Sequence, residues 1–138
     1  MSFSLTIRVY AQDTDFGGVV HHTSYLRFME RARAEWAYRH GVALNQLATG
    51  GNYFVVRDAK VHYVRGATLG DELDIVSSLH KIGQARLVYE QEVRSHHDPD
   101  IVYAKALITI AFVNDAFKPV AIPDEIKKAL TQAPDDSA

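Results

Sequence analysis

The sequence predicts an α+β domain in which a mostly antiparallel sheet packs on one long helix. Three observations support this class. A stretch beginning near Tyr25 has apolar residues at helical spacing, five other stretches carry strand patterns, and short turn signals separate the last four of these. One helix covers only one face of a five-stranded sheet. We therefore expect a second copy of the chain to protect the remaining edges and the open face.

The long helix is predicted to run from Tyr25 to about His40. Thr23 or Ser24 is expected to cap its first turn, and Gly41 to close its last one. The arginines along this helix are predicted to form a solvated flank; they are Arg27, Arg31, Arg33 and Arg39. One apolar stripe is predicted to face the core, formed by Tyr25, Phe28, Met29, Ala32 and Trp36.

The first strand is predicted over residues 3–9, because apolar and polar residues alternate there. A connection with one short helical turn follows the long helix. The last strand is apolar on both faces, which indicates a central position in the sheet. Pro123 is predicted to open a short helix that ends near Leu130. Residues 134–138 are predicted to be a frayed tail. The whole chain, 1–138, is predicted to form a single domain. The four later strands are predicted at 53–64, 72–82, 87–95 and 102–114.

Length and composition exclude several classes of function. A length of 138 residues suits one domain, and a formal net charge of −2 argues against a nucleic-acid surface built on bulk positive charge. The absence of cysteine excludes disulfides, thiolate catalysis and cysteine-bound zinc. No apolar run approaches the length of a membrane span, and the first residues lack a signal-peptide pattern. We expect a cytoplasmic protein with no nucleic-acid partner and no membrane insertion.

Chemistry is expected in the loop before the helix. Asp13 and Asp15 precede the pair Gly17–Gly18, and glycines allow a ligand to approach the backbone closely. The first turn of the helix presents N–H groups without internal partners, which stabilise an oxyanion forming at a carbonyl. A neighbouring carboxylate can attack that carbonyl or activate a water molecule, and His22 can orient it or donate a proton.

Each of these residues also has a structural interpretation. An aspartate shortly before a glycine pair commonly bonds its own backbone in a turn, and Asp13 fits that role better than Asp15. His21 and His22 are typical of solvated or capping loop residues. A metal site built from these four side chains matches no known ligand spacing, so we expect no metal and no cofactor.

The sequence from the first strand into the helix resembles the 4-hydroxybenzoyl-CoA thioesterase family of hotdog-fold proteins. Within that family it is most similar to the bacterial acyl-CoA thioesterases associated with the Tol–Pal system. The resemblance extends over most of the chain. It is carried by Arg8-Val9-Tyr10, Asp13-Thr14-Asp15, Gly17-Gly18-Val19-Val20, His22, Ser24-Tyr25 and Glu30-Arg31-Ala32-Arg33.

This resemblance implies a central helix wrapped by a five-stranded antiparallel sheet. It also implies that two chains pair edge to edge into a dimer, that dimers commonly form a homotetramer, and that active sites lie at the subunit interface. Asp15 would be the catalytic carboxylate, acting as nucleophile or general base, and His22 would assist it. The residues that would polarise the carbonyl or position the substrate are Gly17, Gly18, Val19, Thr23 and Ser24.

The implied substrate is an acyl-CoA or aroyl-CoA thioester, with hydroxybenzoyl-CoA among the candidates. Lys81 and Arg86 are predicted to contact the coenzyme A phosphates, followed by Arg57 and Lys60. Two other functions stay open at this point. One is a hotdog-fold enoyl-CoA hydratase or dehydratase, and the other is a non-catalytic module that binds acyl-CoA or a protein.

Overall fold

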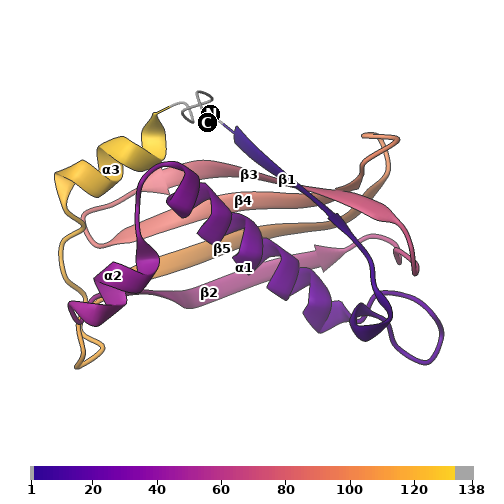
Figure 1. Ribbon diagram of the computed structural model, residues 1–138, viewed down its shortest axis with the longest axis horizontal. Coiled ribbons are helices and arrows are strands. Elements are labelled where there is room, and N and C mark those ends of the chain that lie inside the picture. Colours follow the sequence, from indigo (N-terminus) through magenta and orange to yellow (C-terminus); the bar gives the residue numbers. More distant parts are fainter. Residues whose placement is uncertain (1, 133–138) are drawn as a thin grey trace.

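The computed structural model describes residues 2–132 as one five-stranded sheet with three helices on one of its faces (Figure 1). The predicted tail at residues 134–138 lies outside the described residues. Every predicted strand is present, with ends that agree to within two residues. The elements in chain order are β1 (Ser2–Arg8), a 3-10 turn (Ala11–Asp13), α1 (His22–Arg39), α2 (Leu44–Thr49), β2 (Tyr53–Tyr63), β3 (Glu72–Ile82), β4 (Arg86–Ser95), β5 (Val102–Val113) and α3 (Asp124–Thr131).

The strands lie in the order β1-β3-β4-β5-β2, and every neighbouring pair is antiparallel. β5 lies between β4 and β2, which confirms the central position predicted from its two apolar faces. β1 and β2 are the two edges. β2 carries an irregularity between Val56 and Asp58, where its register against β5 shifts. The long helix α1 crosses one face of the sheet (Figure 1).

The core is centred on the apolar stripe of α1, as predicted. Trp36 is fully buried, and its ring centroid lies 6.0 Å from that of Phe3 and 5.6 Å from that of Tyr89. Its indole Nε1–H donates to the backbone oxygen of Leu130 at 3.2 Å. β1, β4 and α3 therefore all meet α1 at this one side chain.

α1 begins at His22, three residues earlier than predicted, and the predicted cap at Thr23 or Ser24 is wrong. His21 is the N-cap residue, and its Nδ1 accepts a hydrogen bond from the Thr23 N–H at 3.2 Å. An imidazole in this role is outside the usual set of short polar capping side chains. At the other end, Gly41 adopts a φ of +80° and ends the helix, which confirms that prediction.

A polar network fastens α1 to the sheet. Gln91 is fully buried, and its Nε2 donates to the Met29 backbone oxygen and to Ser77 Oγ, both at 2.9 Å. Its Oε1 accepts from Arg33 Nη1 at 2.8 Å. The prediction that Arg33 is solvated is therefore wrong. The sequence contained one sign of this contact. In the alternating pattern of β4, polar Gln91 falls on the same face as apolar Tyr89.

No helix formed by residues 2–132 is both long enough and apolar enough to span a bilayer.

Candidate active site

The predicted site lies on a narrow loop between β1 and α1. Thr14 and Val20 form an isolated antiparallel bridge, and within it the Asp15 N–H donates to the Val19 oxygen at 2.9 Å. The Val20 N–H donates to the Ala67 oxygen at 2.8 Å, which fastens the loop to the segment after β2. Gly18 turns the loop with a φ of +79°, a conformation that favours glycine.

Asp15 is exposed on this loop, and the backbone orients its carboxylate. Oδ1 accepts a hydrogen bond from the Gly17 N–H at 2.8 Å. For Oδ2, no partner exists among residues 2–132. A Cβ at position 17 would lie 3.3 Å from Oδ1, so any larger residue there would displace the carboxylate by a few tenths of an ångström. One carboxylate oxygen is thus held by the loop and the other is available to a substrate or a water molecule.

Asp13 is buried and has a structural role, as its predicted turn function implies. Its Oδ2 accepts from the Tyr10 N–H at 2.9 Å, and its Oδ1 lies 3.3 Å from Arg27 Nη2. The same Arg27 nitrogen donates to Ser24 Oγ at 2.7 Å, and Ser24 Oγ donates to the Asp13 backbone oxygen at 3.1 Å. These bonds tie the loop to the first turn of α1. Arg27 is therefore part of this anchor rather than a purely solvated side chain.

The cap occupies two of the predicted amide donors at the start of α1. The Thr23 N–H bonds His21 Nδ1, and the Ser24 N–H bonds the His21 oxygen at 2.8 Å. For the N–H groups of His22 and Val19, residues 2–132 supply no acceptor. These two amides are consequently free donors near the junction of the loop and the helix.

The His22 side chain is exposed and is positioned by aromatic packing. Its ring stacks on that of His21 with centroids 4.3 Å apart and meets the Tyr63 ring edge-on at 6.2 Å. Tyr63 Oη also donates to the His22 backbone oxygen at 3.2 Å. No hydrogen bond joins the His22 ring to Asp15 in the described part of the chain. Tyr63 was missed by sequence reasoning, because this contact spans 41 positions and has no local signal.

The residues predicted to hold coenzyme A are not brought together. Lys81 and Arg86 flank the β3–β4 turn, which lies at the opposite end of β3 from Glu72 and the Asp15 loop. At about 3.3 Å per residue, β3 separates the two ends by roughly 33 Å. Arg57 occupies the irregular point of β2. Within one protomer, these side chains do not surround Asp15.

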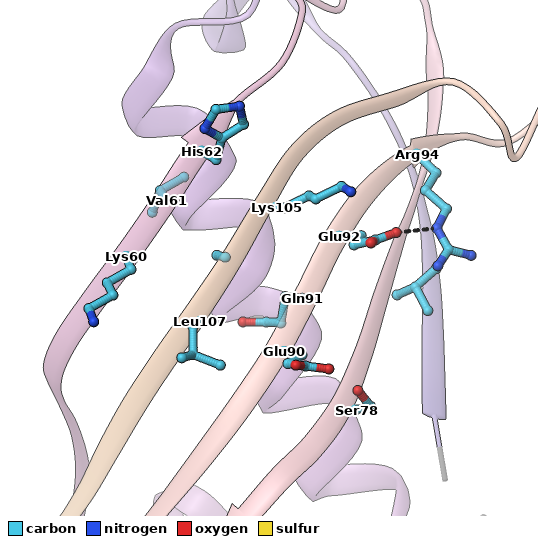
Figure 2. Close-up of a pocket in the computed structure, with 12 residues that line it drawn as sticks. Lys60, Val61, His62, Ser78, Glu90, Gln91, Glu92, Arg94, Lys105 and Leu107 are labelled. Carbon is cyan, nitrogen blue, oxygen red and sulfur yellow. Dashed lines mark hydrogen bonds and ion pairs between the residues drawn. The ribbon is translucent and has the colours of Figure 1, made fainter.

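Lys60 lies on the sheet face opposite α1, in a groove of about 540 Å³. Figure 2 shows Lys60 and His62 on β2 beside Lys105 on β5, with Glu90 and Glu92 on the adjacent strand β4. The groove thus has both basic and acidic walls. This mixed charge does not by itself favour a polyanionic ligand.

Comparison with known proteins agrees with this fold. The thioesterase-like superfamily matches residues 9–130. The chain is 35% identical over 129 residues to an acyl-CoA thioesterase, YbgC, from Haemophilus influenzae, covering 92% of this chain and 93% of that protein.

Two solved structures are similar over nearly the whole chain. A probable thioesterase from Bartonella henselae is 32% identical, with a TM-score of 0.83 over 89% of this chain and 100% of that one. A 1,4-dihydroxy-2-naphthoyl-CoA thioesterase from Synechocystis has a TM-score of 0.87 at 20% identity, over 94% of this chain and 96% of that one, which supports the fold alone. With its hotdog fold and its match over residues 9–130, the chain belongs to the thioesterase-like superfamily.

Proposed function

We propose that this protein hydrolyses an acyl-CoA or aroyl-CoA thioester to the free acid and coenzyme A, with Asp15 as the catalytic carboxylate. That the protein is an acyl-CoA thioesterase rests on its family and on its 35% identical relative. One observation carries the role of Asp15. Its exposed carboxylate is held through Oδ1 by the Gly17 N–H, on the loop that leads into the N-terminus of α1.

The chemistry follows from these groups. Asp15 either attacks the thioester carbonyl or takes a proton from the attacking water, and in both cases the carbonyl oxygen becomes an oxyanion. The His22 N–H lies at the positive end of α1 and would stabilise that oxyanion. The carbon–sulfur bond then breaks, and the thiolate of coenzyme A leaves and takes up a proton, for which the His22 ring is a candidate donor. In the nucleophilic route an acyl–Asp15 anhydride remains, and water hydrolyses it to the free acid.

The first test is thiol release from a panel of aliphatic and aromatic acyl-CoAs that includes hydroxybenzoyl-CoA. We expect steady turnover of at least one member, abolished in an Asp15 variant. An enoyl-CoA in the same panel tests the hydratase alternative, because hydration removes its conjugated absorbance without releasing thiol. Binding of acyl-CoA without turnover of any member would instead favour a non-catalytic module.

Gly17→Ala is expected to lower kcat by up to about tenfold while leaving the melting temperature nearly unchanged. The added Cβ would lie 3.3 Å from Asp15 Oδ1, so the carboxylate must move by a few tenths of an ångström. Thiol-release kinetics and thermal melting measure the two effects. Gly50→Ala at the end of α2 is the matched control, since its φ of −81° suits alanine and the added Cβ would make only an ordinary contact, 3.5 Å from the Leu47 oxygen. Equal kcat values in the two variants would contradict this role for Gly17.

We also propose a homodimer in which two β2 strands pair edge to edge. β2 is a sheet edge, and large apolar side chains on or just after it are exposed: Val56 by 54%, Tyr63 by 43% and Val64 by 48%. Pairing would satisfy the free edge and cover these side chains. A tetramer of two dimers and a cytoplasmic location stay predictions.

Light scattering is expected to give twice the chain mass of 15.4 kDa, or about 31 kDa, for the dimer and a further doubling for the tetramer. Val56→Glu places a pair of like charges at the proposed interface and should yield monomers. Ile82→Glu is the control, because Ile82 is 38% exposed at the far β3–β4 turn. An unchanged mass for Val56→Glu would place the interface elsewhere.

A further inference from the structure

Phe117, in the turn between β5 and α3, is an exposed aromatic residue on an unfavourable backbone. It has a φ of +57° and is the only residue other than glycine with a positive φ among residues 2–132. A bulky side chain is strained in this conformation, and such strain is found most often where a function requires it. Packing within the protomer does not require it, because the side chain is 73% exposed. The strain therefore points to a contact outside the protomer.

Hydrogen bonds hold the turn in this conformation and fasten it to the start of β2. The Asn114 side-chain oxygen accepts the Ala116 N–H at 2.9 Å, and the Phe117 N–H donates to the Asn114 backbone oxygen at 2.9 Å. Tyr53 Oη donates to Asp115 Oδ1 at 3.0 Å. Tyr53 is the first residue of β2, so the turn is attached to one end of this edge strand.

The Asp15 loop is fastened to the other end of β2. Tyr63, the last residue of the strand, donates to the His22 backbone oxygen at 3.2 Å. The loop carries Phe16, which is fully exposed. Among residues 2–132, Phe16 and Phe117 are the two most exposed large apolar side chains. The loop and the β5–α3 turn lie at opposite ends of β2, whose length separates them by roughly 33 Å at about 3.3 Å per residue (Figure 1).

The proposed homodimer brings these two ends together. Two copies of an edge strand that pair across a twofold axis run antiparallel, so the start of β2 in one protomer lies beside the end of β2 in its partner. The β5–α3 turn of each protomer then lies beside the Asp15 loop of the other. We propose that Phe117 packs against Phe16 of the partner subunit and thereby positions the loop that carries the catalytic carboxylate. The symmetry repeats this contact, which covers all four exposed rings of the dimer.

The position of Phe16 explains how such a contact would act on Asp15. Phe16 lies between Asp15 and Gly17, the two residues joined by the 2.8 Å hydrogen bond from the Gly17 N–H to Asp15 Oδ1. Fixing the Phe16 ring therefore fixes the segment that orients the carboxylate. Phe117 is thus a positioning residue that acts in the other protomer's site. This role rests on the proposed function and on the proposed pairing of β2.

Crosslinking tests the contact without requiring turnover. The chain has no cysteine, so Phe16→Cys and Phe117→Cys in one chain supply its only thiols. A short bis-maleimide cannot join them within a protomer, because β2 lies between them, and we expect it to give a covalent dimer on a denaturing gel. Phe16→Cys with Ile82→Cys is the matched control and should stay monomeric on the gel, since Ile82 is 38% exposed on β3, which β4 and β5 separate from β2.

Failure of the first pair to crosslink overturns the proposal, and so does equal crosslinking of the control pair. Either result applies whether or not the protein hydrolyses a thioester. A wild type without turnover would contradict the proposed function, whereas the gel would still decide the contact.

Mixed dimers test the positioning role. Chains with Asp15→Asn and with Phe117→Gly are given different tags and coexpressed, and the dimer that carries both tags is purified. Glycine accepts a φ of +57°, so the turn keeps its shape. The Phe117→Gly homodimer should lose about tenfold in kcat, and Phe117→Leu should keep most of it. The mixed dimer should reach about half the wild-type rate, because one of its two sites then has both Asp15 and the partner's Phe117.

The mixed dimer also separates this role from damage to the fold, because its active site lies on the Phe117→Gly chain. If Phe117 acted within its own protomer, neither site would be intact, and the rate would stay at or below half that of the Phe117→Gly homodimer. That result overturns the positioning role, as does wild-type kcat in the Phe117→Gly homodimer.

Discussion

Asp15→Asn is expected to lower kcat for thioester hydrolysis by about 100- to 10,000-fold, the usual contribution of a general base. The amide cannot attack the carbonyl or accept a proton from water. Its Oδ1 can still accept the Gly17 N–H that Asp15 accepts at 2.8 Å, so the loop keeps its shape. Thiol release with the best substrate of the panel measures the loss.

Two comparisons make this result specific. Asp100→Asn removes an exposed carboxylate at the β4–β5 turn and should leave kcat unchanged. Thermal melting of Asp15→Asn should match the wild type to within about 2 °C, since a ΔΔG of 1 kcal/mol shifts a domain of this size by about 4 °C. Near-normal turnover in Asp15→Asn would remove Asp15 from the mechanism and leave the fold assignment intact.

The second large effect is on stability. Trp36→Ala is expected to reduce the free energy of unfolding by about 3–5 kcal/mol, as replacing a fully buried tryptophan usually does. The substitution opens a cavity beside Phe3 and Tyr89 and removes the N–H that bonds the Leu130 oxygen at 3.2 Å. Domains are typically stable by only about 5–15 kcal/mol, so much of the total would be lost.

Denaturant unfolding followed by circular dichroism measures this change. Tyr38→Ala on the same helix is the matched control, because Tyr38 is 48% exposed; we expect a change within about 0.5 kcal/mol. If Trp36→Ala cost no more than Tyr38→Ala, the junction at Trp36 would not be the centre of the core.

Much of the fold could be predicted because local patterns encode it. Alternation and turn signals located β3 over its full length, and the two apolar faces of β5 indicated its central position. The start of α1 was predicted three residues too late, although capping was one of the roles expected of His21. The cap depends on the His21 ring turning back onto the Thr23 N–H, which no local pattern specifies. The full strand order was also out of reach of local patterns. β2 pairs with β5 and β1 with β3 across long stretches of sequence.

The loop was the predictable part of the site. Its residue types and glycine spacing made Asp15 the candidate carboxylate, and that role stays a prediction. Asp13 bonds the backbone as predicted, but so does Asp15 through the Gly17 N–H, although the turn role was expected to fit Asp13 better. The surroundings were not predictable, because they depend on contacts between distant elements. Tyr63 reaches His22 from the end of β2, and Arg33 reaches Gln91 across the gap between helix and sheet. Gln91, the polar residue on the apolar face of β4, was a usable signal for the contact with Arg33.

Trp36 has one further consequence, because it is the single tryptophan of the chain. All indole fluorescence therefore originates where Phe3 of the first strand and Leu130 of the last helix meet α1. Detachment of either terminal element would expose the ring to water and shift its emission to longer wavelengths. The emission spectrum of the unmodified protein thus reports the docking of both terminal elements, with no label and no change near Asp15.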